Sequence, residues 1–328
     1  MSEHPEWRDG IARAFALDGK GGARVIGWPE VEAWKPGDGP MWVHLERNHP
    51  RTRQWIHGGA GLHHEIAEAL TVEGSRPRTT VENGSLLLFL RGINHNEGAE
   101  PEDMVALRMW VEAERLISLR VDVMQSPRIV GERFFAGSGA KTVSGLMVDL
   151  IREIVDRIAP VIDAAEERMA DLEEDLLERE PKEVRETLSD ARREAIVLRR
   201  YLVPQREAFL SLVNTSLPWM KKNHVLAVRE SSERLRLFVD DLDAVRERAL
   251  VSQEELSSRL SDELNKRMYV LSLVAAIFLP LGLITGLLGI NVGGIPGSND
   301  SVAFWFVCGF LLLMALGQYA LLRRMKWM

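Results

Sequence analysis

The chain has 328 residues, of which 46% are hydrophobic and 27% are charged, and its formal net charge is -7. This length holds a soluble domain of ordinary size together with further segments. The acidic balance argues against nucleic-acid binding, which needs a basic face, and suits a surface that concentrates cations, although it equally suits plain solubility.

The first residues, Met1–Arg8, contain neither the basic start nor the apolar core of a secretory signal. We therefore expect the large charged region that follows them to remain in the cytoplasm.

Residues 1–145 alternate short apolar runs with turns, which predicts a mixed α/β domain whose strand order the sequence does not define. A hairpin is expected to turn near Ala113 and Glu114, and His63–Leu70 has a helical pattern. The expected strands are Ile11–Leu17, Met41–Leu45, Ser85–Leu90, Val105–Glu112 and Leu116–Val121.

Residues 146–221 have the pattern of a helical hairpin. The first helix carries apolar residues every fourth position, and Pro160 is expected to bend it slightly. Glu180–Pro181 marks a turn before a second helix, Lys182–Leu212. The acidic run Asp163–Glu180 is interpreted as a solvated helix face rather than a set of binding sites. The apolar stripe is Leu146, Leu150, Ile154, Ile158 and Ile162.

Residues 222–267 are predicted to form a stalk helix. No Pro or Gly follows Lys222 before Pro280, so stalk and first apolar run are expected to form one helix of about 65 residues, about 100 Å long. An apolar seam with three-and-four spacing needs packing partners along such a rod. The seam consists of Leu235, Phe238, Leu242, Val245, Ala249, Ser252 and Leu256.

Two membrane spans are expected at 268–288 and 302–322, because each run is uncharged and long enough for the ~20 residues that cross a bilayer. The loop between them, 289–301, has no Lys or Arg, whereas basic residues precede the first span and the tail 323–328 is basic. Both ends are therefore expected to face the cytoplasm. The single cysteine, Cys308, lies in the second span and excludes an intrachain disulfide and a multi-thiolate metal site.

The outer loop begins with Gly289-Ile290-Asn291, and continues with Val292-Gly293-Gly294. An uncharged, glycine-rich turn can offer backbone carbonyls and one carboxamide to an ion that sheds part of its water. Asn291 can also cap the end of the first span, and the two roles are compatible.

This motif, placed between two C-terminal spans after a long charged helical region, resembles the CorA superfamily of divalent-cation transporters. Ile290, where the superfamily commonly has Met, is similar to its zinc-transporting, ZntB-like branch. The resemblance implies an α+β cytosolic domain, a helical stalk and two transmembrane helices per subunit. It also implies a homopentamer in a bacterial inner membrane, with a selectivity filter at Gly289, Ile290 and Asn291. Divalent metal, zinc first, is then the transported substrate, and no cofactor is expected.

One face of the first span would line the axial pore of such a pentamer. This face carries no charge, so an ion would keep much of its water there, and Met268 and Leu279 would form apolar constrictions. Ordinary helix packing, with Gly282 and Gly286 allowing neighbours to approach, is the alternative that the residues alone favour. The face consists of Asn265, Met268, Ser272, Ala275, Leu279, Gly282 and Gly286.

Asp300 is the only acid of the outer loop, and in a pentamer it would supply a ring of carboxylates at the pore mouth. It could equally be a solvated loop residue. Because the spans hold no Asp, Glu, His, Lys or Arg, proton coupling would have to use Asp300, the stalk carboxylates or water. The sequence neither supports nor excludes such coupling.

The histidines do not form a recognisable zinc site. His63 and His64 are adjacent and point to different helix faces, and the other histidines lack ligand spacing. Regulatory metal ligands are therefore unknown, and the assignment of zinc as the transported ion rests on the resemblance alone.

Other functions stay open at this point. A magnesium, cobalt or nickel transporter of the same superfamily is the nearest alternative, and a non-conducting membrane scaffold or sensor is the second. The soluble region contains no phosphate-binding loop, nucleophile elbow or metal-ligand triad, so an enzyme is not expected.

Overall fold

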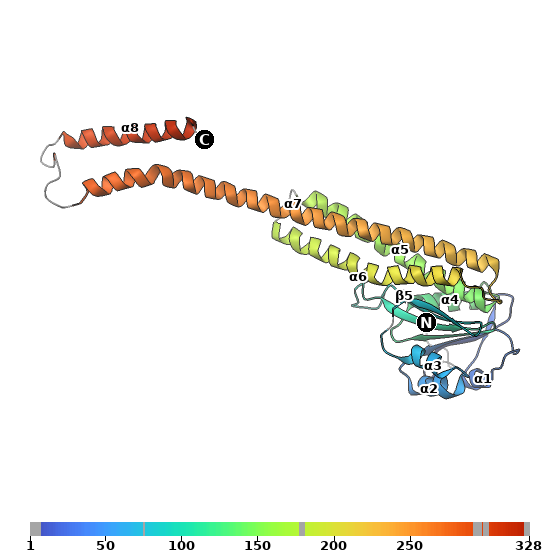
Figure 1. The fold of residues 1–328 in the computed structure, drawn as a ribbon. Helices are drawn as coiled ribbons and strands as arrows, with labels where there is room; N and C mark the ends of the chain where they lie inside the picture. Colours follow the sequence, from blue (N-terminus) through green and yellow to red (C-terminus); the bar gives the residue numbers. More distant parts are fainter. Residues whose placement is uncertain (1–7, 75, 177–180, 291–296, 298–301, 325–328) are drawn as a thin grey trace. The chain divides into compact units, whose positions relative to one another are not determined.

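The computed structural model describes residues 8–74, 76–176, 181–290, 297 and 302–324 (Figure 1). The chain divides into two compact units, Met1–Gln253 and Glu254–Met328. The predicted fold class is confirmed, because an α+β region precedes a helical stalk and two long apolar helices.

The first unit is built on a seven-stranded sheet with the order β2-β1-β3-β7-β6-β5-β4. Only the β3–β7 pair is parallel, and every other pair of neighbours is antiparallel. The strands are β1 (Ile11–Leu17), β2 (Ala23–Val25), β3 (Met41–Glu46), β4 (Arg78–Glu82), β5 (Ser85–Gly92), β6 (Val105–Val111) and β7 (Arg115–Arg120).

The strands expected from the sequence are confirmed as β1, β3, β5, β6 and β7, and β6 and β7 form the expected hairpin. The edge strands β2 and β4 were missed. β2 is too short to show alternation, and β4 is a mostly polar edge strand. The sequence did offer a signal for the turn between β4 and β5, namely the dipeptide Asn83-Gly84. Both residues have positive φ (50° and 76°), as a tight hairpin requires.

Helices cover both faces of the sheet (Figure 1). One face holds α1 (Trp28–Ala33), α2 (Pro50–Gln54), the π-helix η1 (Trp55–Gly59) and α3 (His64–Thr71). The other holds α4 (Gln125–Phe135), α5 (Val143–Asp175) and α6 (Pro181–Val213), of which α5 and α6 contact each other and the sheet. Of these, α3 confirms the helix expected at His63–Leu70, whereas α1, α2, η1 and α4 were not predicted.

Between the sheet and α4, Phe15 is fully buried with its ring 5.7 Å from that of Trp42 and 5.3 Å from that of Phe134. His44 lies in the same layer and shares a 2.9 Å hydrogen bond between its Nδ1 and the Ser118 hydroxyl. Burial lowers the pKa of His44 well below its usual value. The histidine is therefore a buried core residue, and no group of three His, Cys, Asp or Glu among the described residues is placed to hold a metal ion around it.

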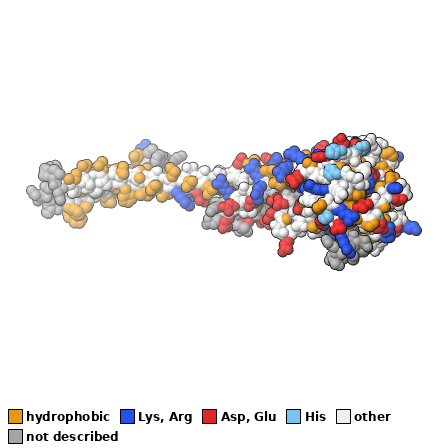
Figure 2. Space-filling view, turned by 90° about the horizontal axis from the view of Figure 1, so that it is seen from below, with side chains coloured by type: hydrophobic (Ala, Val, Ile, Leu, Met, Phe, Trp, Pro, Cys, Tyr) orange, Lys and Arg blue, Asp and Glu red, His pale blue; other side chains and the backbone are white. Residues whose placement is uncertain are grey.

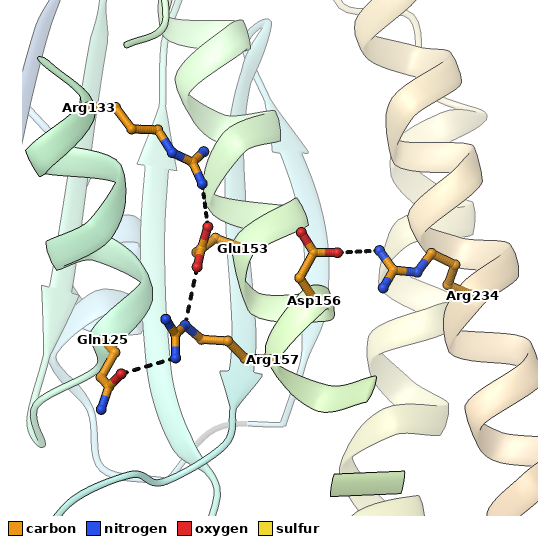
Figure 3. Close-up of polar contacts among 6 residues, drawn as sticks. All are labelled: Gln125, Arg133, Glu153, Asp156, Arg157 and Arg234. Atoms are coloured by element: carbon orange, nitrogen blue, oxygen red, sulfur yellow. Dashed lines mark hydrogen bonds and ion pairs between the residues drawn. The ribbon is translucent and has the colours of Figure 1, made fainter. Parts of the chain in front are cut away.

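A chain of polar contacts fixes α4 against α5 (Figure 3). Glu153 of α5 pairs with Arg133 of α4 and, at 3.2 Å, with Arg157 one turn further along α5. Arg157 in turn donates to the Gln125 side chain at 3.0 Å. Because Glu153 is almost fully buried, each arginine offsets the cost of removing its charge from water.

The third long helix, α7, extends over Lys222–Leu288 without interruption. Its 67 residues confirm the expectation of one continuous helix of about 65 residues. Ion pairs join its first part to α5 through Arg234 and Asp156 (Figure 3), and to α6 through Arg199 and Asp243 at 2.8 Å. The division of the chain at 145, 221 and 267 stays a prediction, whereas the compact units meet within α7.

The apolar seam of α7 finds its partners inside the same chain. Leu235, Leu242 and Ala249 are completely buried, and Val245 is 1% exposed. The ion pairs to α5 and α6 identify those helices as the covering surface. The partner that the seam required is thus the chain's own helical hairpin, which leaves the opposite face of α7 uncovered.

The described part of the acidic run on α5 is a solvated face, as expected. Asp163, Glu167 and Asp171 are exposed. Glu173 bonds Arg248 of α7 at 2.8 Å between Oε1 and Nε, and this hydrogen bond lowers the pKa of the carboxyl. The end of the run, 177–180, lies outside the described residues.

The second unit contains the end of α7 and α8 (Ala303–Arg324). Both helices are long and apolar enough to cross a membrane, judged by length and composition. Figure 2 shows hydrophobic side chains over this unit, whereas charged side chains crowd the surface of the first.

We expect Leu242→Ala to lower the free energy of unfolding by about 3 kcal/mol, because it empties a fully buried position between α7 and the hairpin. Ile196→Ala on α6 removes a side chain that is 45% exposed and should cost less than about 0.5 kcal/mol. Denaturant unfolding of the purified protein measures both. Equal, small losses would show that the seam is not packed within the chain.

Candidate functional site

The first apolar helix ends at the start of the predicted filter. The Gly289 N–H donates to the carbonyl of Thr285 at 2.9 Å and to that of Gly286 at 3.2 Å, which closes α7. The Thr285 hydroxyl donates back to the carbonyls of Leu281 (3.0 Å) and Gly282 (3.2 Å). The hydroxyl therefore needs no other partner in an apolar surrounding.

A side chain at position 289 would crowd this helix end, because its Cβ would lie 3.1 Å from the Thr285 carbonyl oxygen. Glycine thus keeps the last turn regular. Ile290 follows with its side chain 47% exposed. Asn291 and Asp300 lie outside the described residues, so the filter and the acidic mouth stay predictions.

All seven pore-lining candidates are exposed within one chain. Met268 is 65% and Leu279 is 76% exposed, and a Cβ added to Gly282 or Gly286 would meet nothing within 4 Å. None of the described helices therefore packs on this face of α7. The exposed set is Asn265, Met268, Ser272, Ala275, Leu279, Gly282 and Gly286, and its assignment to a pore stays a prediction.

The opposite face of the same span turns toward α8. Leu273, Ile277 and Ile284 are half-buried and follow each other at helical spacing. An apolar cavity of about 350 Å³ lies between the two helices. Its lining residues are Ile284, Leu287, Leu288, Phe306, Val307 and Phe310. The half-buried residues thus lie on the opposite side of the helix from the seven exposed candidates, whose side we call the free face.

On the stalk, acidic residues continue the free face at a spacing of three and then seven residues, with Leu237, Ala244 and Val251 between them. Glu230 lies 4.0 Å from Arg152 of α5. Glu233 and Asp240 share Arg236, each at 3.0 Å, whereas Glu247 and Glu254 form no ion pair among the described residues. We call this set the acidic stripe: Glu230, Glu233, Asp240, Glu247 and Glu254. By helical spacing it continues through Ser258 and Ser261 to Asn265. Sequence reasoning missed it, although the spacing is visible once the buried seam is known.

The histidines do not assemble a metal site within the described residues, where no group of three His, Cys, Asp or Glu is placed to hold an ion. Figure 2 shows histidine side chains on one face of the first unit. The rings of His57 and His64 are 6.5 Å apart between centroids, but His57 Nε2 is already hydrogen-bonded to the Thr71 hydroxyl at 3.1 Å. Zinc as cargo therefore finds no support in these side chains.

Comparison with known proteins gives a consistent result. A family model described as CorA-like Mg2+ transporter protein matches residues 37–324. The chain is 36% identical over 324 residues to the divalent cation transporter CmaX of Pseudomonas aeruginosa, with 97% of both chains covered. It is 34% identical over 315 residues to the zinc transport protein ZntB of Yersinia enterocolitica, covering 96% of this chain and 95% of that protein. The solved structure of full-length CmaX protein matches with a TM-score of 0.86 at 34% identity, over 99% of this chain and 100% of that one.

The two faces of the span can be distinguished chemically. In a background of Cys308→Ser, we expect Ala275→Cys on the free face to react at least about tenfold faster with a charged, water-soluble thiol reagent than Ile277→Cys on the α8 face. The reason is that a charged reagent enters only a hydrated path. Mass spectrometry of the intact protein measures the rates. Similar slow rates at both positions would place the free face against lipid or protein.

Proposed function

Because the chain belongs to the CorA-like Mg2+ transporter family, we propose that it carries divalent cations across a membrane through the axial pore of a homopentamer, with zinc as the first candidate cargo. The observation that carries this proposal is the free face of α7, which combines an acidic stripe with an uncharged span. Zinc is favoured by the ZntB relatives and by Ile290 in the filter motif.

A ring of subunits gives the free face a role. Within each chain the seam of α7 is covered by α5 and α6, and the span is covered on one side by α8. Copies arranged about an axis would present the remaining face to the centre. A long helix that is exposed along one stripe is stabilised when copies enclose that stripe.

The proposed path uses charge outside the membrane and its absence inside. The acidic stripe raises the local concentration of cations at the cytoplasmic end. In the span, no fixed charge holds a stripped ion, so the cation passes with most of its water. Met268 and Leu279 narrow this path with apolar side chains, which can close it by excluding water. At the outer end, Asn291 and the neighbouring carbonyls replace part of the hydration shell, and Asp300 collects cations at the mouth.

Orientation and coupling follow from the distribution of charge. Lys266 and Arg267 precede the first span and Arg323 and Arg324 follow the second, so both termini lie in the cytoplasm of a bacterium, with the loop outside. Proton coupling would use Asp300 or the acidic stripe, because the spans have no titratable carboxylate or imidazole.

Flux into liposomes tests the proposal. We expect zinc to enter vesicles containing the purified protein faster than magnesium, as reported by a zinc-sensitive dye or its magnesium counterpart inside. Asn291→Ala should reduce zinc entry at least about tenfold without changing the oligomer, because the carboxamide replaces water at the filter. Each ion is measured with and without a proton gradient.

A faster magnesium, cobalt or nickel flux would reassign the cargo within the family. A well-folded oligomer without any divalent flux would support a non-conducting scaffold or sensor instead.

The acidic stripe has its own test. We expect Glu247→Gln with Glu254→Gln to slow zinc entry about threefold at ~0.01 M salt and little at ~0.2 M salt, because screening shortens the reach of these charges. Glu186→Gln on α6 changes an exposed acid away from the stripe and is the matched control. Initial rates at low zinc measure the effect. A loss that is independent of salt, or equal in the control, would remove the stripe from the path.

A further inference from the structure

Another cavity lies in the first unit, away from the free face of α7. A cavity of about 630 Å³ opens where the β4–β5 and β6–β7 turns meet the link between α6 and α7. Its walls include Trp34, Trp219, Asn83, Glu112, Glu114 and Arg115. This volume is typical of a site for a small organic molecule, and its walls come from chain segments far apart in the sequence.

Arg115 and Glu112 in this cavity neutralise each other in an ion pair. Arg115 donates from Nε to Glu112 at 2.6 Å and from Nη2 at 3.0 Å. The Glu112 carboxylate also accepts the Trp110 indole N–H at 2.9 Å. Both oxygens of Glu112 are therefore occupied, and neither Glu112 nor Arg115 has a charge left for a ligand.

Glu114, unlike Glu112, forms no ion pair among the described residues. One of its carboxylate oxygens accepts the Gly37 N–H at 2.8 Å, which ties the loop after α1 to the β6–β7 turn. Its other oxygen has no hydrogen-bond partner among the described residues, and no arginine or lysine there pairs with it. The cavity therefore carries one uncompensated negative charge.

Two indole rings line the same cavity, and the N–H of each is already used in a hydrogen bond. Trp34 donates its N–H to the Gly39 carbonyl at 3.0 Å, and Trp219 donates to the Gly84 carbonyl at 2.7 Å. These bonds fix the rings, so that the cavity meets aromatic carbon rather than a free donor. Trp34 already binds one cation in this way, since the Arg115 guanidinium lies 4.8 Å from its ring centroid.

We propose that this cavity binds an organic ammonium ion, with the positive charge beside Glu114 and the attached carbon groups against Trp219. Fixed aromatic faces and a single carboxylate recognise such a cation, whereas a small hydrated metal ion gains little from indole carbon. Trp219 lies in the short link that ends at Lys222, where α7 begins. A bound ligand therefore touches the segment from which α7 starts. The site does not depend on the proposed transport.

Choline is a suitable probe, and 3,3-dimethyl-1-butanol is its uncharged counterpart of the same shape. Calorimetric titration of the full-length protein in metal-free buffer should show saturable choline binding at one site per chain and at least about tenfold weaker binding of the alcohol. Absence of saturable choline binding, or equal binding of the alcohol, would overturn the proposal.

Variants locate the site. Glu114→Gln keeps an acceptor for the Gly37 N–H but removes the charge, and should weaken choline binding about tenfold. Trp219→Leu should weaken it about fivefold through loss of the ring, and serves as a second test if the first variant folds poorly. Asp103→Asn, an exposed acid before β6 at the other end of the hairpin, should leave the affinity unchanged. Unchanged affinity in both Glu114→Gln and Trp219→Leu would place choline elsewhere.

Discussion

The burial of one face of α7 is the constraint on which the rest of the structure depends. An isolated helix of 67 residues has no reason to stay straight in water, but its seam is closed by α5 and α6 and fastened by arginine–carboxylate pairs. Those two helices rest on the sheet in turn. Because α5 and α6 cover one side of α7, their position on the sheet determines which side of α7 stays exposed.

The free side changes its chemistry where the surroundings change. In the stalk, water can solvate the acidic stripe, so its charges cost little free energy. They act on ions over about the Debye length. In the span, a charge would be costly, and the same side carries small or apolar residues from Met268 to Gly286. The Thr285 hydroxyl there is satisfied within the helix. Along the proposed path, one helix would thereby attract cations at one end and leave them hydrated at the other.

Much of this architecture was predictable from the sequence, because hydrophobic periodicity and uncharged runs act locally. They identified the central strands, the continuous α7 and both apolar helices. The edge strand β4, too polar to alternate, and the strand order, which depends on contacts between distant segments, were beyond such reasoning. The same holds for the seam of α7, whose spacing cannot tell the chain's own hairpin from a second copy. The cavity beside Trp219 is formed by turns that only folding brings together, and no sequence motif predicts it.

The distribution of proline and glycine along α7 divides this helix mechanically. From Lys222 to Leu279 it contains neither residue, and every N–H after the first turn can hold a carbonyl one turn back. Pro280 then leaves the Ala276 carbonyl without its helical donor, and Gly282, Gly286 and Gly289 follow closely. Bending compliance is thus concentrated in the outer half of the span. The stalk therefore resists bending, and the segment between Pro280 and Gly289 is where the helix bends most easily.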